Sequence, residues 1–150
     1  MNVDVPVESA SAADLPAIER LLTAAALPID GVRDGLDGFV VIRDGAELVA
    51  LAGREHYDAA VLLRSVVVAD HARGHGLGHR IVADCLARAA RAGATDAYLL
   101  TTTAEPFFGR LGFTTIARDG IAEAVRESAE FTSLCPASAT VMHRRLSALG

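Results

Sequence analysis

A basic, glycine-rich segment directly after an apolar run holds the residues with the clearest chemistry in this sequence. The segment covers residues 73–78 in the order Arg-Gly-His-Gly-Leu-Gly, and the apolar run before it includes Val66 to Val68. A strand, a glycine loop and a helix N-terminus in that order form an anion site, because the loop amides and the helix dipole favour negative charge. Three of the five histidines and two arginines lie between positions 71 and 80, in a chain of net charge −5. This local basicity predicts a phosphate-bearing ligand.

The glycine spacing distinguishes the segment from two common nucleotide-binding loops. Gly74, Gly76 and Gly78 do not have the spacing of the dinucleotide-binding fingerprint. The Gly-Lys-Ser/Thr sequence that ends a P-loop is also absent after them. No cysteine or carboxylate completes a ligand set with the nearby histidines, so we expect no metal site. For these histidines, solvated positions are favoured over a catalytic role.

Composition limits the classes of protein to which the chain can belong. A length of 150 residues and 51% hydrophobic residues suit a single domain, residues 1–150, with a real core. The net negative charge argues against nucleic-acid binding, which needs a broad basic surface. The N-terminus lacks the pattern of a secretory signal, no apolar run approaches the roughly 20 residues of a membrane span, and the two cysteines form no disulfide framework. We therefore expect a soluble cytoplasmic protein that binds neither nucleic acid nor membrane.

The elements that must position the glycine segment follow from hydrophobic periodicity and turn residues. A helix is expected to begin near Asp14, with Pro16 in its first turn, and the helix after the glycine segment should bury Cys85 and end at Gly93. The order of elements indicates an α+β fold with a mixed sheet, in which a right-handed crossover makes the strand at 98–101 parallel to the strand before the glycine segment. Further helices are expected at residues 29–36, 105–111 and 121–130. Strands are expected at residues 3–9, 39–42, 47–53, 60–68, 98–101, 113–116 and 139–146.

Two motifs resemble those of the GCN5-related N-acetyltransferase (GNAT) family. Arg73-x-x-Gly76-x-Gly78 after a strand is similar to the family's pyrophosphate-binding signature, which holds acetyl-coenzyme A (acetyl-CoA). Residues 107–113, Phe-Phe-Gly-Arg-Leu-Gly-Phe, are similar to the family pattern F-Y-x-x-x-G-F that flanks the coenzyme A (CoA) thiol. The resemblance covers nearly the whole chain. It implies a GNAT fold, in which a mixed, mostly antiparallel central sheet is splayed between strands 4 and 5 and flanked by helices.

The resemblance also implies the cofactor and the residues that hold it. Acetyl-CoA would be the co-substrate, without a metal, and the backbones of Val66 and Val68 would pair with its pantetheine arm while the side chain of Val67 points into the core. Backbone donors near Val66 would polarise the thioester carbonyl. Phe108 stands where many relatives have a tyrosine that protonates the thiolate, but a thiol of pKa about 8.5 is a good leaving group without it. The implied cofactor-binding residues are Val66, Val67, Val68, Arg73, Gly74, His75, Gly76, Leu77, Gly78, Thr101 and Phe108.

Three charged residues are candidates for the chemistry at the amine. An ammonium must lose a proton before it attacks a thioester, and Glu55 sits where relatives often carry a glutamate that faces the acetyl group. Glu55 is therefore the candidate base, with a solvated turn residue as the alternative. Arg64 and Arg33 are candidates to bind an acidic group of the substrate by a bidentate contact, with ordinary surface charges as the alternative.

The C-terminal pattern E-F-x-S-x-C-P-x-S-A-x-x-M, residues 130–142, resembles a branch of small acetyltransferases found with arsenic-resistance genes. Some of these acetylate arsinothricin or phosphinothricin, and the branch also resembles N-acetylglutamate synthase-type domains. The resemblance implies direct acetyl transfer to the amine of a small acidic amino acid or analogue, by a homodimer, with Cys135 either structural or an arsenic ligand. The alternatives are a catalytically inactive acetyl-CoA sensor and a protein N-terminal acetyltransferase.

Overall fold

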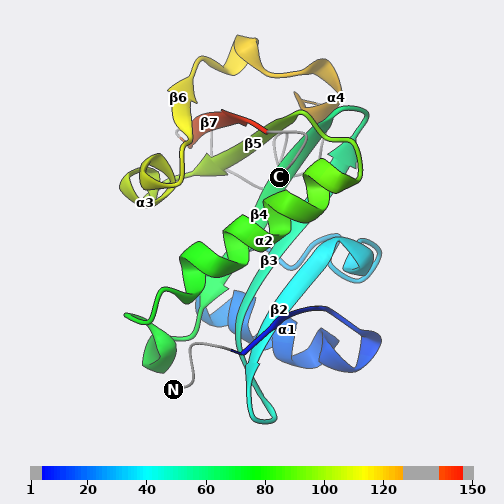
Figure 1. Ribbon diagram of the computed structural model, residues 1–150, viewed down its shortest axis with the longest axis vertical. Helices are drawn as coiled ribbons and strands as arrows, with labels where there is room; N and C mark the ends of the chain where they lie inside the picture. Colours follow the sequence, from blue (N-terminus) through cyan, green and yellow to red (C-terminus); the bar gives the residue numbers. More distant parts are fainter. Residues whose placement is uncertain (1–4, 127–138, 147–150) are drawn as a thin grey trace. The chain divides into compact units, whose positions relative to one another are not determined.

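One hydrogen-bonded sheet of seven strands is found among residues 5–126 and 139–146, which the computed structural model describes (Figure 1). The strands follow the order β1-β2-β3-β4-β5-β7-β6 across the sheet. β4 and β5 are parallel, whereas the β1–β2, β2–β3, β5–β7 and β6–β7 pairs are antiparallel, so the predicted mixed sheet is confirmed. The strands are β1 (Val7–Ser9), β2 (Phe39–Asp44), β3 (Glu47–Tyr57), β4 (Ala60–Val68), β5 (Asp96–Thr101), β6 (Thr114–Ile116) and β7 (Thr140–Arg145).

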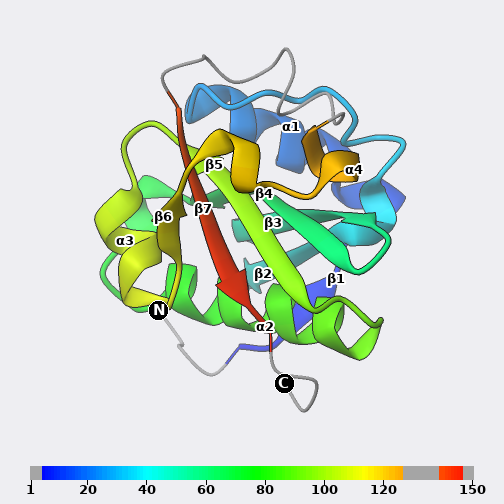
Figure 2. The ribbon, with the colours of Figure 1, turned by 90° about the horizontal axis from the view of Figure 1, so that it is seen from above.

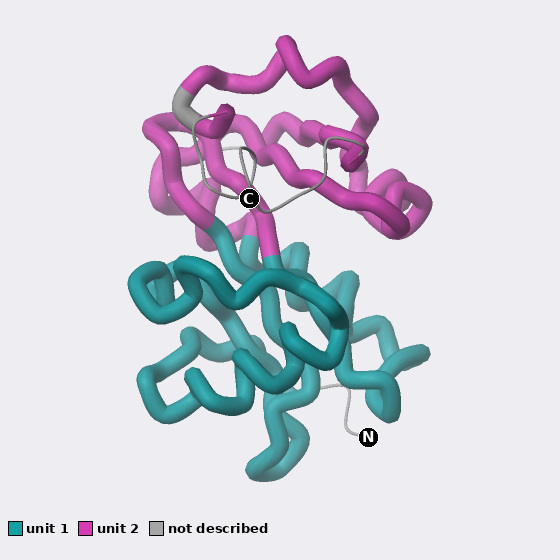
Figure 3. The backbone as a smooth tube through the Cα atoms, turned by 180° about the vertical axis from the view of Figure 1, so that it is seen from behind, with its two compact units in different colours: residues 1–54, 65–85 teal, residues 55–64, 86–150 magenta. Residues whose placement is uncertain are grey.

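The chain divides into two compact units, drawn in teal and magenta in Figure 3. The first unit comprises Met1–Arg54 and Ser65–Cys85, and the second comprises Glu55–Arg64 and Leu86–Gly150. Each unit has a buried apolar cluster of its own. The expectation that residues 1–150 form one domain stays a prediction.

The first unit is built around α1 (Leu15–Ala24), which packs its apolar face on β2 and β3. Ile18 and Leu22 recur one helical turn apart and are completely buried beside Phe39 and Leu51. Pro16 lies in the first turn, where its missing N–H does no harm, so the predicted start of this helix is confirmed.

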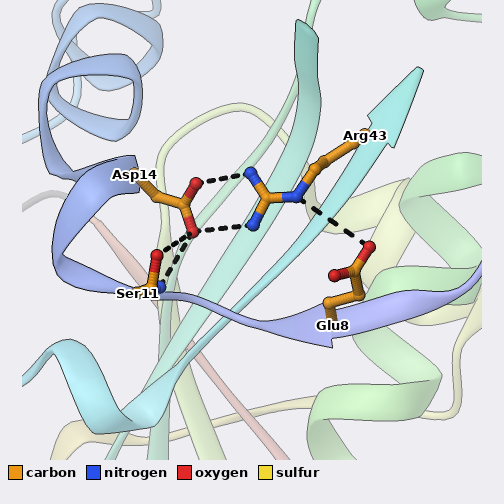
Figure 4. A network of polar contacts seen from close by, with 4 residues as sticks. All are labelled: Glu8, Ser11, Asp14 and Arg43. Carbon is orange, nitrogen blue, oxygen red and sulfur yellow. Dashed lines mark hydrogen bonds and ion pairs between the residues drawn. The ribbon is translucent and has the colours of Figure 1, made fainter. Parts of the chain in front are cut away.

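A polar network joins the start of α1 to β1 and β2 (Figure 4). Both carboxylate oxygens of Asp14 accept hydrogen bonds from the Arg43 guanidinium, one of them at 2.8 Å. Asp14 also accepts from the N–H of Ser11 at 2.8 Å and from its hydroxyl at 3.2 Å, and Glu8 lies 3.9 Å from the Arg43 Nε. The hydrogen bonds from Arg43, which outweigh burial, lower the pKa of Asp14 from 3.8 to about 2. This network fixes the chain where it turns from β1 into α1.

The second unit places β7 between β5 and β6, and Figure 2 shows these three strands side by side. Tyr98 of β5 lies opposite His143 of β7, with ring centroids 4.9 Å apart. His143 bonds to Asp96 at 2.7 Å. Burial opposes ionisation of Asp96, but hydrogen bonds from His143 and Thr95 outweigh it and hold the pKa of Asp96 below its usual value. Beyond α1, the described part of the chain also contains the helices α2 (Leu77–Arg91), α3 (Glu105–Arg110) and α4 (Glu123–Arg126).

Two of the expected elements differ from the structure for local reasons. The predicted helix at residues 29–36 is wrong: these residues form turns that lead into a short 3-10 turn at Leu36–Gly38, because Gly31 takes a positive φ of 78° that no right-handed helix accommodates. Of the predicted first strand at 3–9, residues 3 and 4 lie outside the described residues. Residues 5 and 6 are not in the strand, and β1 begins at Val7, because Pro6 has no N–H for the sheet. Of the predicted helix at 121–130, residues 123–126 form α4 and residues 127–130 lie outside the described residues, as does the segment with Cys135. Cys85 is buried as predicted.

Candidate active site

The glycine segment leads directly from the end of β4 into α2. Gly74 and Gly76 have positive φ angles of 87° and 76°, which glycine adopts far more readily than other residues. A Cβ atom added at either position would meet no atom within 4 Å, so these glycines serve the backbone conformation and leave one side of the loop open. The predicted strand, glycine loop and helix therefore occur in the predicted order.

Backbone amides at the start of α2 are the groups that can hold an anion. The first hydrogen bond of the helix runs from the N–H of Arg80 to the carbonyl of Gly76, at 3.1 Å. The N–H groups of Leu77, Gly78 and His79 precede this bond and have no acceptor within the helix. They point along the helix axis at its positive end, the geometry that suits a phosphate.

Arg73 lies folded back on the loop that carries it. Its Nε donates to the carbonyl of Val68 at 3.4 Å, and its Nη2 pairs with Asp70 at 3.2 Å. The side chain is 66% exposed, so its charge is largely screened by solvent. The amides therefore carry more of the attraction than this side chain.

An irregular residue interrupts β4 ahead of the loop. Ser65 is buried and has a φ of 60°, a left-handed conformation that is rare for a residue with a side chain. Beyond it, Val67 is buried as predicted, while Val66 and Val68 are partly exposed.

The parallel pairing of β4 with β5 is short. Its register covers three residue pairs, from Ala60 with Asp96 to Leu62 with Tyr98, although both strands continue further. A backbone that leaves its neighbouring strand in this way offers N–H and carbonyl groups to a ligand that carries amides.

A cluster of hydrogen-bonded polar and charged side chains lies on the β3–β4 hairpin, within the second unit. Oε2 of Glu55 accepts from Nη1 of Arg64 at 2.9 Å, and its Oε1 accepts from the hydroxyl of Tyr57 at 2.5 Å. The Arg64 side chain is only 2% exposed, whereas that of Glu55 is 26% exposed. The guanidinium that we expected to bind a substrate is therefore directed at a carboxylate of the chain itself.

The role of Tyr57 was missed by sequence reasoning, because a single tyrosine in a turn region carries no signal. The strand pattern of β3 could have indicated Tyr57, because residues two apart on a strand share a face and Tyr57 lies two residues after the candidate Glu55.

The remaining predicted site residues lie apart from this cluster along the chain. Thr101 accepts a hydrogen bond from the N–H of Ala104 at 2.9 Å, at the turn that leads into α3. Phe108 is buried and makes edge-to-face contacts with Phe107 and Phe113, at 5.0 and 5.9 Å. Arg33 is exposed in the turns between α1 and β2.

Metal ligands and membrane spans can be assessed over the same residues. In residues 5–126 and 139–146, no three His, Cys, Asp or Glu side chains come together in a way that could hold a metal ion. None of the helices described has both the length and the apolar character that crossing a bilayer requires.

Comparisons with known proteins agree with this geometry. The sequence model of the family described as "Acetyltransferase (GNAT) domain" matches residues 35–115, just over half of the chain. No curated protein matches the sequence.

Several solved structures are similar over nearly the full chain. N-acetylglutamate synthase from Neisseria gonorrhoeae, complexed with CoA and N-acetyl-glutamate, is 19% identical with a TM-score of 0.84; the match covers 98% of this chain but only 36% of that one. Rv2747 from Mycobacterium tuberculosis, complexed with CoA and NLQ, is 25% identical with a TM-score of 0.81, over 95% of this chain and 99% of the other. The ribosomal-protein-S18-alanine N-acetyltransferase from Escherichia coli is 16% identical with a TM-score of 0.72, over 95% and 94%.

Proposed function

The chain belongs to the GNAT acetyltransferase family, and from that premise we propose that it transfers the acetyl group of acetyl-CoA to the amine of a small acidic amino acid or analogue, within a ternary complex. The observation that carries the proposal is the left-handed glycine loop between β4 and the N-terminus of α2. That loop presents consecutive amides at the positive end of a helix, which suits the diphosphate of a nucleotide cofactor. Two similar structures, from N. gonorrhoeae and M. tuberculosis, contain CoA.

The cofactor would extend from the glycine loop along β4. The amides of Gly76 to Gly78 would hold the diphosphate, and the backbones of Val66 and Val68 would pair with the amides of the pantetheine arm. Thr101 and Phe108 would flank the thiol end. The side chains of Val66 and Val68 matter little in this arrangement, because the backbone makes the contacts.

The reaction requires removal of a proton from the acceptor ammonium and stabilisation of the negative charge that develops on the thioester oxygen. Glu55 would take a proton from the acceptor ammonium, and the neutral nitrogen would attack the thioester carbon. A backbone donor near Val66 would stabilise the negative oxygen of the tetrahedral intermediate before the thiolate leaves. Phe108 has no proton to give, so the thiolate would leave as an anion or take a proton from water.

The acceptor would be a molecule with a glutamate-like skeleton. The N. gonorrhoeae enzyme bound to N-acetyl-glutamate supports this class. Analogues in which a phosphinate or arsinate replaces a carboxylate belong to the same class, and their acetylation would give resistance to such toxins. Arg33, which is exposed, would contact an acidic group of the acceptor.

The test combines binding with turnover. Calorimetry with acetyl-CoA measures cofactor binding, and thiol release measures transfer to glutamate, phosphinothricin, arsinothricin, methionine sulfone and polyamines. We expect tight cofactor binding and turnover with the glutamate-like acceptors. Tight binding without turnover on any amine would instead support a cofactor sensor, the alternative that the phenylalanine at position 108 favours.

A matched pair of glycine variants tests the loop itself. Gly76 and Gly45 both have positive φ, 76° and 64°, and a Cβ added at either meets no atom within 4 Å. Gly76→Ala and Gly45→Ala therefore introduce similar backbone strain, but Gly45 lies in the β2–β3 turn. We expect Gly76→Ala to raise the KM for acetyl-CoA about tenfold, since left-handed strain costs about 1–2 kcal/mol. Equal KM values in the two folded variants would remove the glycine loop from the site.

A further inference from the structure

Arg64 is one of the few charged residues that the described part of the chain buries. Its side chain is 2% exposed, and its Nη1 donates to Oε2 of Glu55 at 2.9 Å. Removing the partner of a buried charge leaves that charge uncompensated, which is strongly unfavourable. The buried pair therefore ties Arg64 to Glu55.

Tyr57 completes the support of the same carboxylate. Its hydroxyl donates to Oε1 of Glu55 at 2.5 Å, so each oxygen of Glu55 accepts one hydrogen bond from a side chain of the hairpin. A carboxylate oxygen has two acceptor sites, so each oxygen keeps capacity for a further contact. The Glu55 side chain is 26% exposed, which is enough for one edge of the carboxylate to meet solvent or a ligand.

We infer that Arg64 and Tyr57 are positioning residues that hold the Glu55 carboxylate in the orientation in which it removes a proton from the acceptor ammonium. The inference rests on the proposed function. In the step itself, an N–H bond of the ammonium breaks and its proton moves to the remaining acceptor site of Glu55. The nitrogen electron pair then forms the bond to the acetyl carbon, and the carbon–sulfur bond breaks with its electron pair leaving on the thiolate. The nitrogen, which becomes positive on forming this bond, gives its second proton to water or to the thiolate, so the product is a neutral amide. Arg64 and Tyr57 act only through Glu55 and do not touch the acceptor.

A double-mutant cycle separates positioning from a merely structural effect. Tyr57→Phe removes one hydrogen bond and keeps the ring, and Glu55→Gln removes the base. The matched control is Tyr98→Phe, which changes a buried tyrosine of the same unit whose ring contacts that of His143 at a tilt. The kinetic constants are measured by thiol release with acetyl-CoA and L-glutamate, and CoA affinity is measured by calorimetry.

The expected pattern is a loss of kcat without a loss of cofactor binding. Tyr57→Phe should lower kcat about tenfold, the usual effect of losing a hydrogen bond to a charged group, while the KM for acetyl-CoA and the Kd for CoA stay unchanged. Glu55→Gln should lower kcat by about 100-fold or more. The double variant should be no slower than Glu55→Gln alone, because Tyr57 acts through Glu55. Tyr98→Phe should stay within about twofold of the wild type.

Arg64 is tested by a conservative replacement. Arg64→Lys keeps the buried charge and should retain more kcat than Arg64→Met, with urea unfolding used to confirm that each variant folds. If Arg64→Met does not fold, the Tyr57 cycle alone decides the inference.

Three outcomes would overturn the inference, and the assays distinguish them. An additive loss in the double variant, or a Tyr57→Phe variant as active as Tyr98→Phe, refutes the positioning roles while the proposed function stands. A wild-type protein that binds CoA but acetylates no amine refutes the proposed function and, with it, the role of Glu55 as a base.

Discussion

Replacing Asp14 with asparagine should lower the free energy of unfolding by about 2 kcal/mol at neutral pH. The Asp14 side chain is 8% exposed, and both of its oxygens accept hydrogen bonds from Arg43. These bonds lower its pKa from 3.8 to about 2. A change of one pH unit in a pKa corresponds to about 1.4 kcal/mol, so the ionised carboxylate stabilises the folded state by about 2.4 kcal/mol. Asparagine keeps the shape and removes the charge.

The pH dependence of this difference gives the prediction its sign. The pKa of Asp14 is lower in the folded state, so the unfolded chain binds the proton first as the pH falls. The stabilisation is complete above the unfolded value of 3.8 and is lost as the pH falls toward the folded value of about 2. The gap between the wild type and Asp14→Asn should therefore be constant from pH 7 to pH 5 and narrow between pH 4 and pH 3.

Urea unfolding followed by circular dichroism measures this gap at each pH. Asp34→Asn, at an exposed turn position, is the matched control and should change stability by less than about 0.5 kcal/mol. A gap at pH 3 as large as the gap at pH 7 would show that the charge of Asp14 contributes nothing, and the reasoning from Arg43 would fail.

Two further predictions concern other parts of the fold. Gly53→Ala should destabilise the protein by about 1–3 kcal/mol, because its Cβ would lie 2.6 Å from the buried ring of Phe39; chemical denaturation measures this, and unchanged stability would mean that the ring moves freely. Asp96→Asn should lower stability at pH 7, because its partner His143 helps hold the pKa of Asp96 below 3.8, and the loss should shrink as the pH falls below that value. Unfolding midpoints of Asp96→Asn that follow the wild type in parallel down to pH 3 would contradict the second prediction.

The glycine loop could be predicted because its signal is local. The positive φ angles of Gly74 and Gly76, the preceding strand and the following helix all occur within about twenty residues, where turn and helix chemistry act directly on the sequence. The β2–β3 hairpin could also be predicted, because an Asp-Gly pair between two apolar runs is a strong signal for a hairpin turn.

The Glu55 cluster could be predicted only in part, because it depends on the pairing of two strands. Glu55 and Arg64 were each singled out, but the spacing of nine residues does not reveal that they meet. Their contact follows from the turn position and the register of the hairpin, and the strand before the turn was expected at residues 47–53, which stops short of Glu55 and Tyr57. The predicted helix at 29–36 failed for the opposite reason: the pattern was read as local structure, but Gly31 reverses the backbone within it.

The hairpin from Glu55 to Arg64 carries its whole charge cluster on ten consecutive residues. A gene segment of thirty bases therefore encodes the proposed base and its two proposed positioning residues together, so recombination or grafting could transfer all three as one segment. Because the three side chains share one short hairpin, a change in its length would disturb all of their contacts. One codon inserted at Asp58 or Ala59, where the chain reverses, would shift the strand alternation and send Glu55 and Arg64 to opposite faces.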